Sequence, residues 1–256
     1  THDERTKVLG EIGGVAKTID RMIDPVLDSY INKTEGIRAE QRIRCQEVLR
    51  SPLHALIGMT EMAVDAMDKI SEDDMNAMRK TMSAGAHQVA VATHQLILFS
   101  ATDEYNLKPK NDILPLNELI TSFTGSFDLR NKKTVEMQFQ SAVSDDATIT
   151  TDHDTITEIL FAIYHYMDKY SRGGTINTTC EAEVDGTYTL KVCNHGLRIQ
   201  DDEAEEAFQP FSLIGDQTTG LGLSLALARR LALVLGYQLS IDTTYTHGTC
   251  LVVKGM

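Results

Sequence analysis

The sequence lacks any long apolar run and any run of basic residues. No stretch approaches the roughly 20 apolar residues that a helix needs to cross a bilayer, and nothing at the N-terminus has the pattern of a signal peptide. The 24 Lys and Arg residues are outnumbered by 37 Asp and Glu residues, which gives a formal net charge of −13. Because like charges repel, this balance argues against nonspecific binding to nucleic acid or to anionic membranes. We therefore expect no nucleic-acid partner and no direct membrane contact.

Cysteine is scarce too, at four residues: Cys45, Cys180, Cys193 and Cys250. They do not cluster at the spacing of metal ligands, and each falls on an expected helix or strand. We expect reduced thiols that pack in the fold rather than disulfides, and we expect no metal site.

The chain does have enough apolar residues for two modest cores, since 42% of its 256 residues are hydrophobic. It contains no internal repeat and no low-complexity stretch. Pro109 and Pro115 indicate a linker and a domain boundary between them. The expected organisation is a helical lead-in over residues 1–35, a helical hairpin over 36–106, a linker over 107–118 and a second domain over 119–256.

Apolar residues in the first domain recur at steps of three and four, which places them on single helical faces. Ser71 has the position of a helix N-cap, with Asp74 at the capping-box position that follows it. The two apolar stripes are Leu49, Leu53, Leu56, Thr60, Ala63 and Met67, and then Met78, Met82, Gly85, Val89, Ala92, Leu96 and Phe99. Two helices cannot bury both stripes by themselves, so we expect a homodimer that forms a four-helix bundle.

The second domain alternates strand and helix patterns. The tight turn Asp185-Gly186 joins two of the strands, because glycine tolerates a positive φ. Strands are expected over 134–140, 147–151, 175–182, 187–193, 238–242 and 250–253, and helices over 155–170 and 223–235. The simplest packing is a mixed sheet with helices on one face, in an α/β sandwich. Acidic residues in Asp152-His153-Asp154 suit the N-terminus of the first of these helices, and a metal site there is the less favoured interpretation.

Two local motifs lie within this pattern. The turn Gly220-Leu221-Gly222 opens the last helix, where glycines and the helix N-terminus can admit a phosphate. The same turn is equally common as plain packing at a helix start. In the first domain, the segment from Arg50 to Glu61 places a proline inside an apolar helical repeat, which should kink the helix.

These features resemble a known family. The order of elements in the second domain resembles the ATP-binding domain of the histidine-kinase, gyrase and Hsp90 superfamily. The segment Arg50-Ser51-Pro52-Leu53-His54 and the residues after it resemble the phosphoacceptor helix of hybrid-type sensor histidine kinases. The resemblance covers roughly residues 35–256. It implies a dimerisation hairpin, followed by a nucleotide-binding α/β sandwich.

The chain departs from this family at the acceptor helix. The resemblance places the phosphoacceptor histidine at Glu47 and its acidic neighbour at Val48. A carboxylate does not form the phosphoramidate that a neutral imidazole forms. His54 lies two turns further along nearly the same face and is an alternative acceptor, although an ordinary polar substitution is the favoured interpretation. The resemblance also makes Glu47, Arg50 and His54 candidates for binding a partner.

The implied nucleotide site is altered as well. The resemblance places the two asparagines of its magnesium-binding box at Ala162 and Tyr166, neither of which is a good ligand for a hard cation. Its adenine-reading aspartate is Asn194, which could still accept a hydrogen bond. A later glycine is Arg198, which could fill the pocket or bind phosphate, although a place in solvent is the favoured interpretation. The positions that match the nucleotide site are Ala162, Tyr166, Lys169, Asn194, Gly196, Gly220 and Gly222. The lid segment that ends at Gly220 carries Asp216 and no Lys or Arg. ATP and Mg²⁺ are therefore expected to bind weakly or not at all.

We expect a degenerate sensor histidine-kinase core that signals by dimerising and by binding a response regulator or another sensor kinase. Two alternatives remain open: an active kinase with a non-standard acceptor or nucleotide site, and a purely structural dimerisation scaffold. Because the sequence begins at Thr1, it is expected to be a cytoplasmic piece of a longer sensor.

Overall fold

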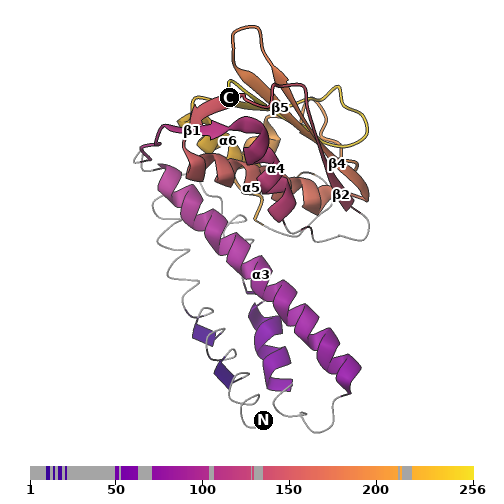
Figure 1. Ribbon diagram of the computed structural model, residues 1–256. Coiled ribbons are helices and arrows are strands. Elements are labelled where there is room, and N and C mark those ends of the chain that lie inside the picture. The colour runs from indigo at the N-terminus through magenta and orange to yellow at the C-terminus, as the bar shows by residue number, and fades with distance from the viewer. Residues whose placement is uncertain are drawn as a thin grey trace. The chain divides into compact units, whose positions relative to one another are not determined.

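The computed structural model of the protein describes residues 50, 51, 53–62, 71–103, 107–127, 129, 135–212, 214 and 221–256, together with Gly10, Glu11, Gly14, Lys17, Thr18 and Arg21 (Figure 1). The chain forms two compact units. The first contains residues 1–100 with 219–221, and the second contains 101–218 with 222–256.

The first unit is helical wherever it is described, apart from Ser71 and Leu221. Its longest element is α3, Glu72–Asp103. The predicted capping box starts this helix: Ser71 Oγ accepts from Asp74 N at 3.1 Å and lies 2.6 Å from Asp74 Oδ2. A second helical segment covers residues 53–62, and Lys17 of the lead-in pairs with Glu61 at 2.7 Å.

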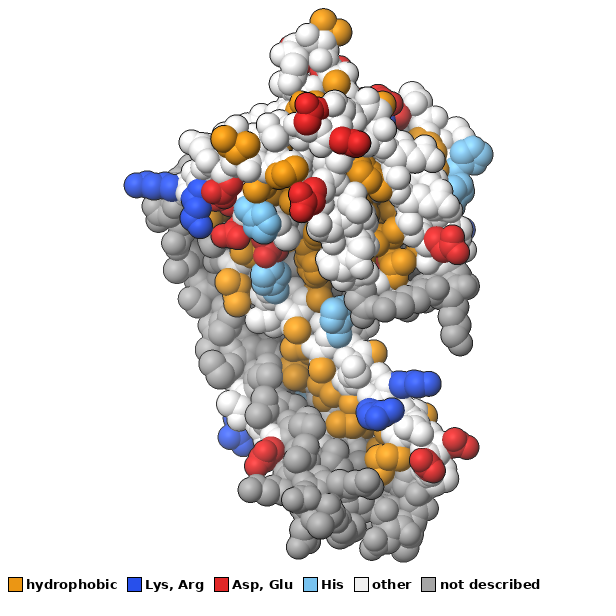
Figure 2. All heavy atoms as spheres, in the orientation of Figure 1, with side chains coloured by type: hydrophobic (Ala, Val, Ile, Leu, Met, Phe, Trp, Pro, Cys, Tyr) orange, Lys and Arg blue, Asp and Glu red, His pale blue; other side chains and the backbone are white. Residues whose placement is uncertain are grey.

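The predicted apolar stripes are covered unevenly in the single chain. Leu53, Leu56 and Thr60 are buried, as is the part of the second stripe from Val89 to Phe99. Its first part, Met78, Met82 and Gly85, is only half-buried. Figure 2 shows hydrophobic side chains gathered along this helix between charged ones. Part of the apolar surface is thus left for another contact.

The second unit is built on a five-stranded mixed sheet in the order β2-β4-β5-β7-β6. Its strands are β2 Val135–Ser141, β4 Gly174–Ala182, β5 Tyr188–Cys193, β6 Gln238–Ile241 and β7 Cys250–Lys254. β2 and β4 pair in parallel, and all the other pairs are antiparallel. The predicted Asp185-Gly186 turn closes the β4–β5 hairpin, with φ of +86° at Gly186.

Helices cover one side of this sheet (Figure 1). They are α4 Leu116–Ser126, α5 His153–Tyr170 and α6 Ser224–Val234. α5 supplies much of the core, because Ile159, Ile163 and Met167 are fully buried. The Tyr164 hydroxyl is hydrogen-bonded to the Thr178 hydroxyl of β4, which ties the helix to the sheet. The predicted mixed sheet and helices are confirmed.

The segment predicted as a linker contains regular structure after Asn111. β1, Asp112–Pro115, pairs antiparallel with β3, Thr148–Thr151, in a separate two-stranded sheet, and α4 follows at once. Pro115 is compatible with β1 because β1 is an edge strand of a two-stranded sheet, where a missing N–H costs little. The proline was therefore a poor indicator of a linker at this point.

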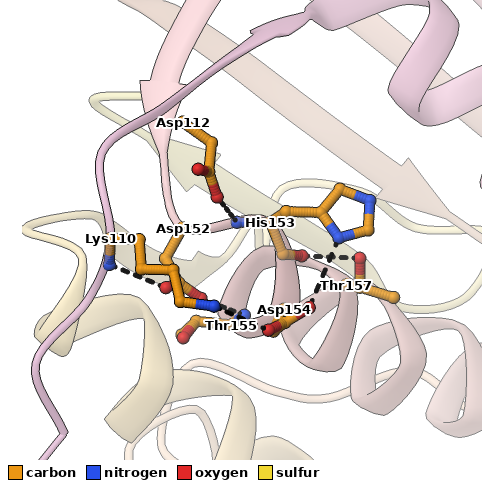
Figure 3. A network of polar contacts seen from close by, with 7 residues as sticks. All are labelled: Lys110, Asp112, Asp152, His153, Asp154, Thr155 and Thr157. Carbon is orange, nitrogen blue, oxygen red and sulfur yellow. Dashed lines mark hydrogen bonds and ion pairs between the residues drawn. The ribbon is translucent and has the colours of Figure 1, made fainter.

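A polar network fixes the start of α5 (Figure 3). Asp152 is the N-cap: its carboxylate accepts from Thr155 N at 2.7 Å and from Lys110 N at 2.7 Å. Desolvation opposes its ionisation, but these backbone donors hold the pKa of Asp152 below its ordinary value. Asp112 accepts from His153 N at 3.3 Å, and Lys110 Nζ lies 3.6 Å from Asp154. The acidic turn thus acts as a helix cap.

The cysteine prediction needs a correction. Cys193 and Cys250 face each other in the register of β5 and β7, with Cα atoms 4.0 Å apart, and form a disulfide. The sequence could not reveal this pair, because 57 residues separate its members. Cys180 is a buried free thiol, and burial raises its pKa to about 11. Cys45 lies outside the described residues.

Within the part of the chain that the structure describes, no helix is both long enough and apolar enough to span a membrane.

Candidate nucleotide site

Two of the positions that match the nucleotide site, Asn194 and Gly196, lie just after β5 and contact the end of α5. Ala162 and Tyr166 lie one turn apart on α5, and both side chains are buried. Ala162 offers only a methyl group. Tyr166 carries a phenol hydroxyl, which is a poor ligand for a hard dication. Neither side chain gives this part of α5 the amide oxygen that magnesium would need.

Asn194 is fully buried directly after β5, and both ends of its carboxamide hold the fold together. Its Oδ1 accepts from Thr249 N at 3.0 Å, and its Nδ2 donates to Met167 O at 3.0 Å. The backbone of the same residue donates to Thr249 O at 2.9 Å. An aspartate could replace only the accepting half of this arrangement. The side chain expected to read adenine therefore links α5, β5 and β7 to one another.

Thr249 extends this network to Leu197, because Thr249 Oγ1 donates to Leu197 O at 2.7 Å. The Thr249 side chain also lies beside Tyr166, where it opposes the rise in the pKa of the phenol. Tyr166, Met167, Asn194, Leu197 and Thr249 together form what we call the closed network. It starts and ends on α5, because Tyr166 and Met167 are consecutive residues of that helix. Both polar ends of Asn194, the residue at the expected base-binding position, are thus hydrogen-bonded within the protein.

Aromatic and acidic side chains complete the surroundings of Tyr166. Its ring packs against Tyr170, with ring centres 4.5 Å apart. Lys169 Nζ donates to the Tyr170 hydroxyl at 3.1 Å and lies 4.7 Å from the centre of that ring. Burial, and then the neighbouring Tyr170 and Glu203, raise the pKa of Tyr166 far above its ordinary value, so its hydroxyl stays protonated at neutral pH. A carboxylate near this position also disfavours a triphosphate.

The two described glycines of the predicted site have roles in chain packing. A Cβ on Gly196 would lie 2.0 Å from Tyr170 O. A Cβ on Gly222 would lie 2.3 Å from Ser212 O, and its φ is +67°, so the close approach to Phe211 and Ser212 requires glycine. Gly222 thus has the role in helix-start packing that was one of the two interpretations of the Gly220-Leu221-Gly222 turn. Gly220 and Asp216 lie outside the described residues.

Arg198 does not enter the closed network. Its side chain is exposed, and its guanidinium donates to Thr243 O at 3.3 Å. Its side chain thus lies in solvent, as the favoured interpretation expected.

The acceptor helix is described in part. His54 is exposed and Arg50 is half-buried at the start of the helical segment. Glu47, Val48 and Pro52 lie outside the described residues, so the altered acceptor position remains a prediction.

Three members of the closed network were not predicted from the sequence: Thr249 and the carbonyls of Met167 and Leu197. Thr249 lies between Gly248 and the expected strand over 250–253, and this position was the sequence feature that could have pointed to it. Met167 acts through its backbone, which residue identity does not reveal. Among the described residues, no group of three or more His, Cys, Asp or Glu side chains is placed to hold a metal ion.

Comparison with known proteins agrees with this architecture. Residues 151–254 match the family described as histidine kinase-, DNA gyrase B- and HSP90-like ATPase. Over 221 residues, 83% of this chain, the sequence is 24% identical to the autoinducer 2 sensor kinase/phosphatase LuxQ of Vibrio cholerae. The chain is a relative of the sensor histidine kinases. It is also 22% identical, over 229 residues and 83% of its length, to the cell-division control histidine kinase PdhS of Brucella anthropi.

The matched part of the chain spans only 25% of the length of the Vibrio cholerae LuxQ and 21% of the length of the Brucella anthropi PdhS. Among solved structures, the Acinetobacter baumannii histidine kinase AdeS has a TM-score of 0.60 and 18% identity, covering 81% of this chain and 96% of AdeS. Full-length ShkA in complex with AMPPNP has a TM-score of 0.60 and 17% identity, covering 84% of this chain and 45% of ShkA. These structural likenesses support the fold: a helical region and a histidine-kinase-type ATPase domain. Together the comparisons show similarity to sensor histidine kinases over most of the chain.

Proposed function

We propose that this chain is a pseudokinase core that signals through dimerisation and partner binding rather than by transferring phosphate from ATP. The closed network is the observation that carries the proposal. Asn194 uses its carbonyl and its amide on the fold, and Tyr166 occupies the position where the family has an asparagine. ATP and Mg²⁺ would then bind weakly or not at all.

Nucleotide titration by calorimetry, with and without Mg²⁺, tests this proposal directly. We expect no heat that fits a micromolar site. Tyr166→Phe serves as a matched variant, because it keeps the ring and removes only the hydroxyl beside Thr249. Magnesium-dependent micromolar binding in the parent would contradict the proposal.

The rival function is an active kinase in which His54 accepts the phosphate. Its support is the exposed position of His54 on the helix that resembles the acceptor helix. Incubation with labelled ATP and Mg²⁺, followed by a test for acid-labile phosphate, separates the two functions. His54→Ala should abolish labelling if the rival is correct, whereas the exposed control His87→Ala should not.

The proposed partners are a second copy of the chain and a response regulator or another sensor kinase. Glu47 would place a fixed negative charge on the docking helix, with Arg50 and His54 further along the chain. Glu47→Ala should change the affinity for the partner and leave the mass of the dimer unchanged. A scaffold without regulation would bind no regulator, and a binding assay with candidate regulators distinguishes it.

A further inference from the structure

Two His-Gly dipeptides, His195-Gly196 and His247-Gly248, meet in space at the end of β5 and the start of β7. Gly196 N donates to His247 O at 3.2 Å. Glycine is required at position 248, because a Cβ there would lie 2.2 Å from Asn194 O and 2.7 Å from Gly196 N. The two backbones can therefore approach closely, and each carries a histidine at the approach.

The two imidazole rings lie near each other and are exposed. Their ring centres are 6.0 Å apart, and their planes are inclined by 38°. A zinc-type ion lies about 2.0–2.1 Å from an imidazole nitrogen, so the ring centres of two ligating histidines are separated by roughly 5–6.5 Å. The observed separation falls within that range.

The surroundings of His195 provide a partner for one nitrogen of its ring. Its Nδ1 lies 3.3 Å from Thr175 O, and the ring lies over Gly174, where an added Cβ would be 3.6 Å from Nδ1. With Nδ1–H donating to this carbonyl, the other nitrogen, Nε2, is left as the electron-pair donor. Histidines that bind metals usually have such a carbonyl partner on the second nitrogen.

We propose that His195 and His247 form a two-histidine clip for a borderline transition-metal ion of the Cu²⁺, Ni²⁺ or Zn²⁺ class, with water in the remaining positions. Imidazole nitrogen suits these ions and does not suit Mg²⁺ or Ca²⁺. Tyr245 lies edge-on to His247, with ring centres 5.8 Å apart, and borders the clip. The proposal is independent of whether the chain binds ATP.

The test is metal titration by calorimetry in a Cys45→Ser background, so that this thiol does not compete for the ion. We expect binding of one ion per chain, tightest for Cu²⁺. His195→Ala and His247→Ala should each weaken binding by about tenfold or more, which corresponds to about 1.4 kcal/mol or more. His153→Ala is the matched control, because His153 is exposed in the same unit beside Asp154.

Thermal denaturation provides a second measurement, since an ion that binds only the folded state raises the midpoint. The rise should occur in the parent and in His153→Ala, and should be lost in both clip variants. Denaturation without metal shows whether each variant is folded, and His195→Gln or His247→Gln replaces any alanine variant that is not. Equal metal affinity in the parent and in folded clip variants would overturn the proposal. Loss of binding in His153→Ala would overturn it as well.

Discussion

Asn194 shows how one buried amide can use both of its polar ends within the fold. Its carbonyl satisfies the Thr249 N–H and its amino group satisfies the Met167 carbonyl, and both contacts are buried. A carboxylate at this place would set an oxygen against the Met167 carbonyl, because it has no hydrogen to donate. An aspartate, which the resemblance implies for this position, is therefore opposed by the surrounding backbone.

Asn194→Asp should lower the free energy of unfolding by roughly 1–3 kcal/mol, the range for an unsatisfied buried polar group. Urea denaturation at neutral pH measures the change. Asn111→Asp, at an exposed position, should leave stability nearly unaltered. From the sequence alone, Asn194→Asp combined with Tyr166→Asn would be expected to improve nucleotide binding. The structure revises that expectation, because Asn194→Asp also destabilises the fold. A stable Asn194→Asp variant with improved ATP binding would contradict this revision.

At the scale of single elements, the start of α5 depends on an ionised cap. The contribution of Asp152 to stability is complete above the unfolded-state pKa of about 4 and is lost as the pH falls through the lowered folded-state value. Asp152→Asn keeps one acceptor oxygen and loses the bond from Thr155 N or from Lys110 N. It should cost about 1 kcal/mol at neutral pH.

The difference in stability between Asp152→Asn and the parent should shrink at acid pH. Denaturation at about pH 7 and about pH 3 measures the difference. Asp154→Asn, which changes an exposed carboxylate in the same turn, should show no comparable loss at neutral pH. An Asp152→Asn effect that is the same at both pH values would show that the charge of the cap is unimportant.

The pairing of β5 with β7 is reinforced by the Cys193–Cys250 disulfide. A crosslink between residues separated by 57 positions restricts the unfolded chain. Its reduction should therefore lower stability by about 2–4 kcal/mol. Denaturation with and without a thiol reductant measures this loss.

The double variant Cys193→Ser, Cys250→Ser should match the reduced parent and should not respond to reductant. Cys180→Ser, which removes the buried free thiol, should keep the response. A parent whose stability is insensitive to reductant would show that the bond contributes little.

At the scale of the whole molecule, the half-buried part of α3 is where we place the dimer contact. Met82→Glu should reduce the dimer to a monomer that remains folded, because Met82 is only half-buried in the single chain. Leu96→Glu should unfold the first unit, because it buries a charge at a cost of several kcal/mol. Light scattering at micromolar concentration and circular dichroism distinguish the two results.

Ser83→Glu adds the same charge at the neighbouring exposed position and should preserve the dimer. A monomeric mass for the parent would rule out the proposed assembly.

The sequence predicted most of the second unit because its signals were local. Alternating apolar residues and the Asp185-Gly186 turn located strands and a hairpin within a few positions of their observed bounds. β1 and α4 were missed because Pro115 was taken to mark a linker, although a proline can end a strand. The closed network and the disulfide could not be predicted, since they join residues 27 to 57 positions apart through the sheet register.

The strand order of the large sheet also has a consequence for how the chain folds. The β4–β5 hairpin joins neighbouring segments and should form early, because closing a short loop loses little entropy. β2 and β4 pair in parallel across the long connection that contains α5, and β5 pairs with β7 across the connection that contains α6 and β6. Asn194 and Thr249 lie at that last junction, so the closed network should form among the final steps of folding.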